Sequence, residues 1–276
     1  MQDYLLKGIY IYPIKSLGAI SLTNSETTEN GIMHDRRWML IDEHHRFMSI
    51  RNNPEFLFFK VGFSKDSFKI SHHESSLELP LSIHNGEEVR CQIWDDEVEA
   101  IQCNPEINQW FSERIGTQCS LVYMPDESER KIKPDWGGTE VSFSDGYPLL
   151  VAGEAALRDL NNKMNEPVEM MRFRPNLVFA GGHPYSEFNW GKFSVGNVKF
   201  QGLKPCTRCI VTTYDPHTAV KGKEPLLTLS RQKINNNIVF GQHAKSVEFG
   251  DIKVGDTIEV SDFKSQPYAE IPELSH

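Results

Sequence analysis

The chain has 276 residues and a formal net charge of −9, with 39% hydrophobic and 24% charged residues. This balance is typical of a globular protein that buries one large core or two smaller ones. No apolar run reaches the length of a membrane-spanning helix, and the acidic balance argues against a nucleic-acid partner. Residues 1–7 lack the basic and apolar stretches of a signal peptide, so a cytoplasmic location is expected.

The first hundred residues are expected to form mainly strands. Runs rich in hydrophobic and β-branched residues predict strands at 4–14, 56–63 and 67–71, and a hairpin from the runs at 37–41 and 46–50. Asn85-Gly86 lies between two strand-like runs and predicts a hairpin turn. Strands at this spacing are typical of a small barrel or sandwich.

Two helices are expected in the middle of the chain. Asn104, Pro105 and Gly116 are suited to begin and end the first, and the second is predicted over 153–164. The polar segment 124–138 between them predicts a surface connection and a domain boundary. Strands are predicted again at 177–179, 192–200, 210–213, 238–240 and 258–260, with a turn at Gly196-Asn197. The sequence thus predicts a mainly β (α+β) fold with a few helices, divided into 1–122, 123–262 and a tail, 263–276.

The odd number and scattered spacing of the five cysteines argue against a disulfide framework. Only Cys206 and Cys209 are close in sequence, and this pair has four interpretations. A structural zinc site would need further Cys or His ligands, and a thioredoxin-like pair would need a following helix, whereas 210–214 is β-branched and strand-like. Two buried thiols, or one thiolate ligand for a soft metal with Arg208 beside it, remain as the other interpretations.

Several basic residues lie beside proline, glycine or polar residues at the ends of predicted strands, where binding groups are commonly found. They are Lys15 (next to Ser16), Arg36, Arg37, Arg172, Arg174, Lys204 and Arg208. If these segments converge, they form an anion-binding pocket in an acidic protein. Asp145, in Ser-Asp-Gly, is either a turn residue or a ligand. The adjacent pairs His44-His45 and His72-His73 are expected to be surface residues and poor metal chelates, because neighbours on a strand point to opposite faces.

Six segments in this order resemble the MOSC proteins with an N-terminal MOSC β-barrel domain, in particular the mitochondrial amidoxime-reducing component and its bacterial homologues. The segments are Tyr12–Ser16, Asp35-Arg36, Phe143–Asp145, Phe173–Asn176, Cys206–Cys209 and Val254–Asp256. The resemblance implies an N-terminal β-barrel-like domain, a MOSC β-barrel domain and a molybdenum–molybdopterin cofactor.

The resemblance also implies roles for individual residues. Cys209 is expected to be the metal ligand and a catalytic residue, and Asp145 is expected to act near the metal. Cofactor binding is expected at Lys15, Ser16, Arg36, Arg174, Asn176, Thr207, Arg208 and Cys209. Cys206 is left as a structural neighbour.

The activity implied by the resemblance is a molybdenum-dependent reduction of N-hydroxylated or N-oxide-type compounds such as amidoximes and hydroxylamines. The sequence lacks the plant-type cysteine cluster that some bacterial relatives carry. A separate flavoprotein, ferredoxin or cytochrome-type protein is therefore expected to donate electrons. The alternatives are a carrier of the molybdenum cofactor and a sulfur-transfer protein that uses a Cys persulfide.

Overall fold

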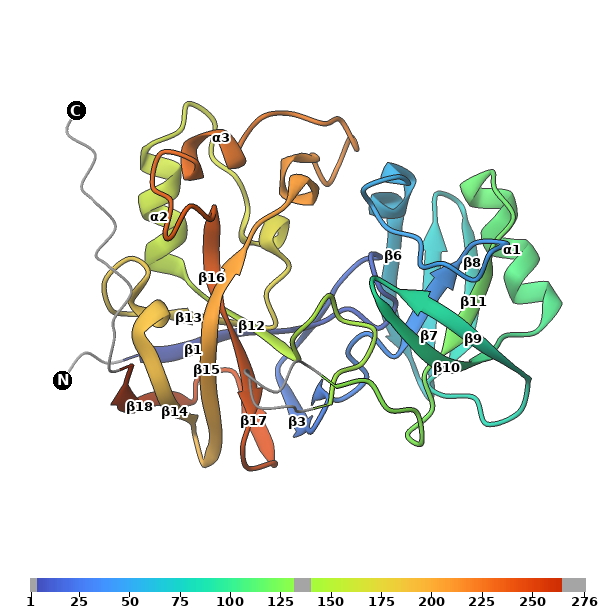
Figure 1. Ribbon diagram of the computed structural model, residues 1–276, viewed down its shortest axis with the longest axis horizontal. Coiled ribbons are helices and arrows are strands. Elements are labelled where there is room, and N and C mark those ends of the chain that lie inside the picture. Colours follow the sequence, from blue (N-terminus) through green and yellow to red (C-terminus); the bar gives the residue numbers. More distant parts are fainter. Residues whose placement is uncertain (1–3, 132–139, 265–276) are drawn as a thin grey trace. The chain divides into compact units, whose positions relative to one another are not determined.

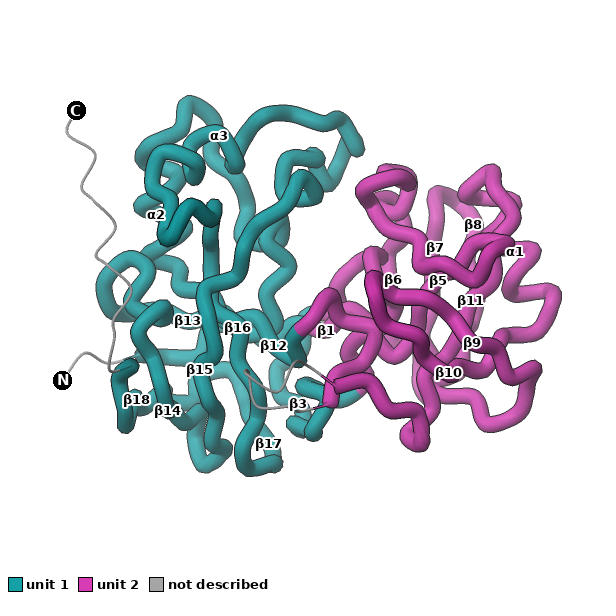
Figure 2. Tube along the Cα trace, viewed as in Figure 1, with its two compact units in different colours: residues 1–10, 21–33, 147–276 teal, residues 11–20, 34–146 magenta. Residues whose placement is uncertain are grey.

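The computed structural model describes residues 4–131 and 140–264. The chain divides into two compact units that interleave in sequence (Figure 2). Unit 1 comprises 1–10, 21–33 and 147–276, and unit 2 comprises 11–20 and 34–146. The units therefore differ from the sequential division at residue 122, because the first strand belongs to the sheet of the C-terminal half. Most of the predicted tail, 265–276, lies outside the described residues.

Unit 1 is built around a closed seven-stranded β-barrel (Figure 1). In order round the barrel, its strands are β1 (Tyr4–Ile11), β13 (Leu177–Ala180), β12 (Leu149–Gly153), β16 (Val239–Ser246), β15 (Val198–Thr207), β14 (Trp190–Val195) and β18 (Thr257–Phe263). The barrel closes because β1 pairs with β13 along one edge and with β18 along the other. Alternate residues of β1 are buried from Tyr4 to Gly8, as expected for a strand with one face toward a core, and near the register shift with β13 both Gly8 and Ile9 are buried.

Smaller elements surround the barrel. β2 (Ile20–Leu22) adjoins β1, while β3 (Asn24–Thr28), β4 (Gly31–Ile32) and β17 (Asp251–Lys253) form a separate small sheet. The helices α2 (Glu154–Asn162) and α3 (Leu226–Leu229) contribute Ala156, Leu160 and Leu229 to one buried cluster. Between α2 and α3 in sequence lie the short 3₁₀ turns η3 (Met170–Phe173), η4 (Ser186–Asn189) and η5 (Ile210–Thr213).

Unit 2 contains two antiparallel sheets. The first has the order β5 (Trp38–Ile41), β11 (Ser120–Tyr123), β10 (Asp96–Gln102) and β9 (Glu87–Ile93). The second is formed by β6 (Phe59–Ser64), β7 (Ser67–His72) and β8 (Ser75–Pro80), and β6 is preceded by the 3₁₀ turn η1 (Pro54–Phe58). Helix α1 (Pro105–Ile115) supplies Phe111, whose ring stacks on Phe59 with centroids 5.7 Å apart.

The predicted mainly β fold with few helices is confirmed, as are both helices. Asn104 caps α1, since its Oδ1 accepts a hydrogen bond from the Ile107 N–H at 2.9 Å, and Gly116 ends it with φ 74°. The Gly196-Asn197 turn also forms, between β14 and β15. None of the helices in 4–131 and 140–264 has the length and apolar composition needed to cross a membrane.

Two predicted elements were wrong, and a third formed only in part. Asn85-Gly86 joins strands of different sheets, β8 and β9, so it is not a hairpin turn. Within unit 2 the two-residue hairpin turns begin instead at Lys65, His73 and Trp94, all with positive φ. The predicted hairpin of 37–41 and 46–50 forms in part. Ile41 pairs antiparallel with Phe47, and the Asp42 and Met48 N–H groups donate to the Arg46 and Leu40 carbonyls, but 46–50 is not a continuous strand. The predicted strand at 210–213 is the turn η5, in which the Thr212 side chain bonds back to the Cys209 carbonyl at 3.0 Å and competes with strand pairing.

Candidate functional site

Lys15 is a buried cation at the centre of a charged cluster in unit 2. Its backbone N–H donates to the Trp38 carbonyl at 2.7 Å, which ties the segment after β1 to β5. Its Nζ donates to the Phe143 carbonyl at 2.8 Å and to Asp145 Oδ1. Burial lowers the pKa of Lys15 to about 8, although the Asp145 carboxylate opposes that shift. The structure therefore brings Lys15 and Asp145, both predicted site residues, into direct contact.

Asp145 forms ion pairs with two cations of unit 2. Besides Lys15, Arg51 Nη2 lies 3.8 Å from Asp145 Oδ2. Desolvation favours the neutral acid, but Lys15, and then Arg51 and Arg36, hold the pKa of Asp145 well below its usual range. An ionised carboxylate is a poor proton donor at neutral pH. The contacts favour a role for Asp145 in holding Lys15 over a role as a general acid.

Arg36 belongs to a second ion pair in the same cluster. The buried Asp35 accepts the Tyr12 backbone N–H through Oδ1 at 2.7 Å and the Arg36 guanidinium through Oδ2. The guanidinium also lies over the Tyr12 ring, 4.6 Å from its centroid. Burial acts against the charge, but Asp35 raises the pKa of Arg36. Asp35 thus orients Arg36 and anchors the backbone at Tyr12.

Three predicted cofactor-binding residues have left-handed backbones. Ser16 has φ 72° and Arg36 has φ 52°, both in unit 2, while Arg174 of unit 1 has φ 53°. This conformation costs roughly 1–3 kcal/mol for a residue with a side chain, and such residues cluster at binding sites and active sites. Other residues with positive φ, such as Lys65 and Trp94, lie in hairpin turns, so the functional role of these three stays a prediction.

Two cations of the unit 2 cluster were missed in the sequence. Arg51 directly follows the predicted strand 46–50, and its guanidinium stacks over the Trp94 ring at 4.7 Å. Arg130 falls in the segment predicted to be a surface connection, yet it is buried and donates to Asp96 and to the Ser142 and Ser144 carbonyls. That prediction was wrong at Arg130; residues 132–138 of the segment lie outside the described residues. Of these two arginines, only Arg51 could have been recognised as a candidate from the sequence, because it directly follows a predicted strand.

The Cys-x-x-Cys segment lies at the end of β15 in unit 1. Cys206 is buried near the end of the strand, Thr207 is its exposed last residue, and Cys209 precedes η5. Cys209 is partly exposed, whereas the other four cysteines are buried. Burial raises the pKa of Cys91 to about 11 and that of Cys103 to about 12, and it also raises the pKa of Cys119. Among the five cysteines, Cys209 is therefore the one that is not buried.

Arg208 connects this segment to η3. Its Nη1 donates to Cys206 Sγ and its Nη2 to the Phe173 carbonyl, each at 2.8 Å. Its Nε is buried without a hydrogen bond to any residue in the described part of the chain. A buried donor without a partner is costly, so Nε is a candidate donor to a bound acceptor. The contact with Phe173 brings the segment that precedes Arg174 next to the cysteine segment.

Asn176 has mainly structural contacts in unit 1. The fully buried side chain accepts the Leu150 backbone N–H and donates to the Tyr10 carbonyl, both at 3.1 Å. Its backbone N–H donates to the Leu150 carbonyl and its own carbonyl accepts from the Tyr10 N–H. Asn176 thus joins β1 to β12 in the barrel and fixes the backbone just after Arg174.

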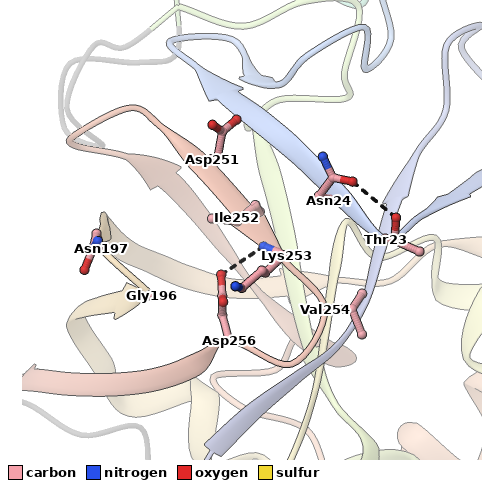
Figure 3. A pocket seen from close by; sticks show the side chains of 9 residues that line it. All are labelled: Thr23, Asn24, Gly196, Asn197, Asp251, Ile252, Lys253, Val254 and Asp256. Carbon is pink, nitrogen blue, oxygen red and sulfur yellow. Dashed lines mark hydrogen bonds between the residues drawn. The ribbon is translucent and has the colours of Figure 1, made fainter.

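Val254–Asp256, the last of the six motif segments, lines a surface hollow of about 820 Å³ in unit 1 (Figure 3). Asp256 Oδ2 accepts the Lys253 backbone N–H at 2.9 Å, and Gly255 has φ 97°. These contacts form a tight turn, and no predicted site residue lines the hollow. The motif therefore marks a turn of the barrel.

Comparison with known proteins gives matches over both halves of the chain. The MOSC N-terminal β-barrel domain matches residues 4–118 and the MOSC domain matches 138–259. Mitochondrial amidoxime-reducing component 1 of Mus musculus is 31% identical over 91% of this chain and 80% of its own length. The Homo sapiens protein of that name is 28% identical over 91% and 81%. A molybdenum cofactor sulfurase of Oryza sativa subsp. japonica is 31% identical over 87% of this chain and 32% of its own length.

Proposed function

The chain belongs to the family of MOSC-domain proteins that includes the mitochondrial amidoxime-reducing components, and on this premise we propose that it is a molybdenum-cofactor-dependent reductase. The proposed substrates are N-hydroxylated or N-oxide-type compounds such as amidoximes and hydroxylamines. The names of the relatives support this class of substrate and a role connected with the molybdenum cofactor.

The partial exposure of Cys209 is the observation that carries the proposal. Thiolate is a ligand that soft metal centres prefer, and Cys209 is the one cysteine of the five that is not buried. The unsatisfied Arg208 Nε nearby in sequence suits an anionic or carbonyl-bearing cofactor. The donor set in unit 1 therefore fits the cofactor, with Cys209 as metal ligand and Arg174, Thr207 and Arg208 as binding residues.

Bound molybdenum would supply a two-electron centre able to take oxygen from an N–O bond, while the protein supplies binding and electrostatics. Arg208 would hold its guanidinium in place through Phe173 and Cys206 and offer its remaining N–H to the cofactor. In unit 2, Asp145 would hold Lys15 in position as a charged pair. The assignment of Lys15, Ser16, Arg36 and Asn176 to cofactor binding stays a prediction.

We also propose a separate electron-donor protein of the flavoprotein, ferredoxin or cytochrome type, and a cytoplasmic location. The five cysteines of the chain include one Cys-x-x-Cys pair and no set of four with iron–sulfur spacing. In this proposal, a separate protein would deliver the electrons for reduction to the cofactor.

The test is to express the wild type, Cys209→Ala and Cys206→Ala in a host that makes the molybdenum cofactor. Molybdenum per chain and the reduction of benzamidoxime with an artificial electron donor would be measured. We expect about one molybdenum per wild-type chain, with turnover. Cys209→Ala should lose both activity and bound metal while its circular dichroism is unchanged, and Cys206→Ala should keep the metal.

Other outcomes would support the alternatives. Molybdenum bound without turnover would identify a cofactor carrier, and labile sulfur on a cysteine without metal would identify a sulfur-transfer protein. A fully active Cys209→Ala variant would show that the ligand assignment is wrong.

A further inference from the structure

Glu55, His72 and His73 bring two imidazoles and one carboxylate together in unit 2. Glu55 lies in η1, His72 is the last residue of β7, and His73 begins the turn to β8. One ligand atom from each residue lies within 4.8 Å of the other two. All three belong to unit 2 and none belongs to the proposed cofactor site.

The backbone of His73 explains why adjacent histidines point to one place. Neighbours on a strand point to opposite faces, which is the basis of the expectation that this pair chelates poorly. His73 has φ 51° instead, at the first position of a two-residue turn. The rings of His72 and His73 therefore lie edge to face, with centroids 4.4 Å apart. The expectation of two surface residues was wrong, because His72 is buried.

The two known donor separations lie on either side of the spacing in a tetrahedral metal site. His72 Nε2 lies 2.8 Å and His73 Nε2 lies 3.8 Å from Glu55 Oε1. Metal–nitrogen and metal–oxygen bonds of about 2.0–2.1 Å place neighbouring donors of a tetrahedral zinc ion roughly 3.3 Å apart. Small movements of Glu55 and of the exposed His73 side chain would reach that spacing, while His72 stays fixed against the Phe59 ring.

The surroundings leave room for a solvent ligand. The two histidines line a surface hollow of about 690 Å³ together with Glu74, Ser75, Glu113 and Arg114. The positive charge of Arg114 opposes a bound cation. However, its guanidinium donates to the Ser75 hydroxyl and the Trp110 carbonyl and pairs with Glu113 at 3.3 Å. Glu74 at the hollow and Glu55 beside the two histidines add negative charge.

We propose that Glu55, His72 and His73 bind a divalent transition-metal ion of the zinc type. Two histidines, one carboxylate and an open position for water are a donor set that zinc takes in proteins. The bound ion would join η1 to the β7–β8 hairpin, and it would be independent of the molybdenum cofactor.

The test uses the full chain with Cys209→Ser as the reference protein, so that the accessible thiol does not bind the probe metal. Zinc chloride is titrated into chelator-treated protein by calorimetry. We expect about one zinc per chain, and an association constant at least about tenfold lower in His73→Ala and in Glu55→Gln. His44→Ala is the control. It removes an exposed histidine of unit 2 that belongs to the other adjacent pair, His44-His45, and should leave the zinc association constant unchanged.

Cobalt gives a second measurement. The reference protein should show the visible bands of tetrahedral cobalt without thiolate charge transfer, and His73→Ala should lose them. Both main substitutions are mild, since His73 is exposed and glutamine has the shape of glutamate, so folded variants are available for comparison. The proposal would be overturned by zinc affinities within twofold of the reference in both variants, or by the absence of saturable binding.

Discussion

Replacement of Glu187 with Gln should stabilise the protein at alkaline pH. Glu187 lies in η4 with no exposed surface. Its Oε1 accepts the Gly153 backbone N–H at 3.3 Å, whereas Oε2 has no hydrogen bond to any residue of 4–131 or 140–264. Burial raises its pKa from the ordinary value of 4.5 to about 7. The folded protein therefore holds this proton at pH values where the unfolded chain has released it.

The sign and size of the change in the free energy of unfolding follow from the difference between the pKa of Glu187 in the folded and in the unfolded chain. The contribution of Glu187 to stability is fully present below pH 4.5 and is lost as the pH rises through about 7. A shift of roughly 2.5 pKa units corresponds to a loss of about 3 kcal/mol, most of it between about pH 5 and 8. Glutamine cannot ionise and can keep the bond to Gly153. Glu187→Gln should therefore gain about 2–3 kcal/mol over the wild type across that interval.

Urea denaturation followed by circular dichroism at several pH values measures the difference. Other carboxylates also titrate, but their effects cancel when the variant and the wild type are compared at each pH. Glu166→Gln, at an exposed position of unit 1, is the matched control and should stay within about 0.5 kcal/mol of the wild type. A stability difference between Glu187→Gln and the wild type that does not change with pH would refute the assigned pKa.

Two further predictions follow from burial. Asp35→Asn should lower the free energy of unfolding by about 3–5 kcal/mol in urea denaturation, because it leaves the Arg36 guanidinium without its buried anion. Asp126→Asn, at an exposed partner of Arg37, is the control and should have an effect below about 1 kcal/mol. Iodoacetamide should alkylate Cys209 of the native protein first, as read by peptide mass mapping, because the other four thiols are buried. Equal labelling of all five thiols would contradict the burial of the four.

Local signals in the sequence predicted elements whose boundaries depend on a few residues. The cap at Asn104, the stop at Gly116 and the turn at Gly196-Asn197 act through local backbone geometry, and all three form. The hairpin predicted at Asn85-Gly86 did not form, because a favourable turn dipeptide does not determine which strands pair. The strand predicted at 210–213 did not form, because the hydroxyl of the β-branched Thr212 donates a hydrogen bond to the Cys209 carbonyl instead. The pairing of β1 with β13 joins residues far apart in the sequence, which no local pattern encodes.

The predicted site residues differ in how much of their environment the sequence revealed. The positions of Lys15, Arg36 and Arg208 next to motif residues were visible, but their partners were not. Asp145 lies about 130 residues from Lys15, and the Phe173 carbonyl lies 35 residues from Arg208. Arg130 could not be identified, because it lies in a polar segment whose composition predicts exposure. Burial of a charge depends on tertiary contacts that composition does not report.

The contacts divide the motif residues into those that hold the scaffold and those that remain available to a ligand. The side chains of Asn176 and Asp35 bond to backbone groups of neighbouring segments, and each fixes the chain beside an arginine with a left-handed backbone. Cys209 is different, because it is the one cysteine that is partly exposed. A motif in this sequence therefore marks both a ligand-binding side chain and the residue that fixes the backbone next to it. The hydrogen bonds of the folded chain show that Asn176 joins strands, whereas Cys209 is the proposed metal ligand.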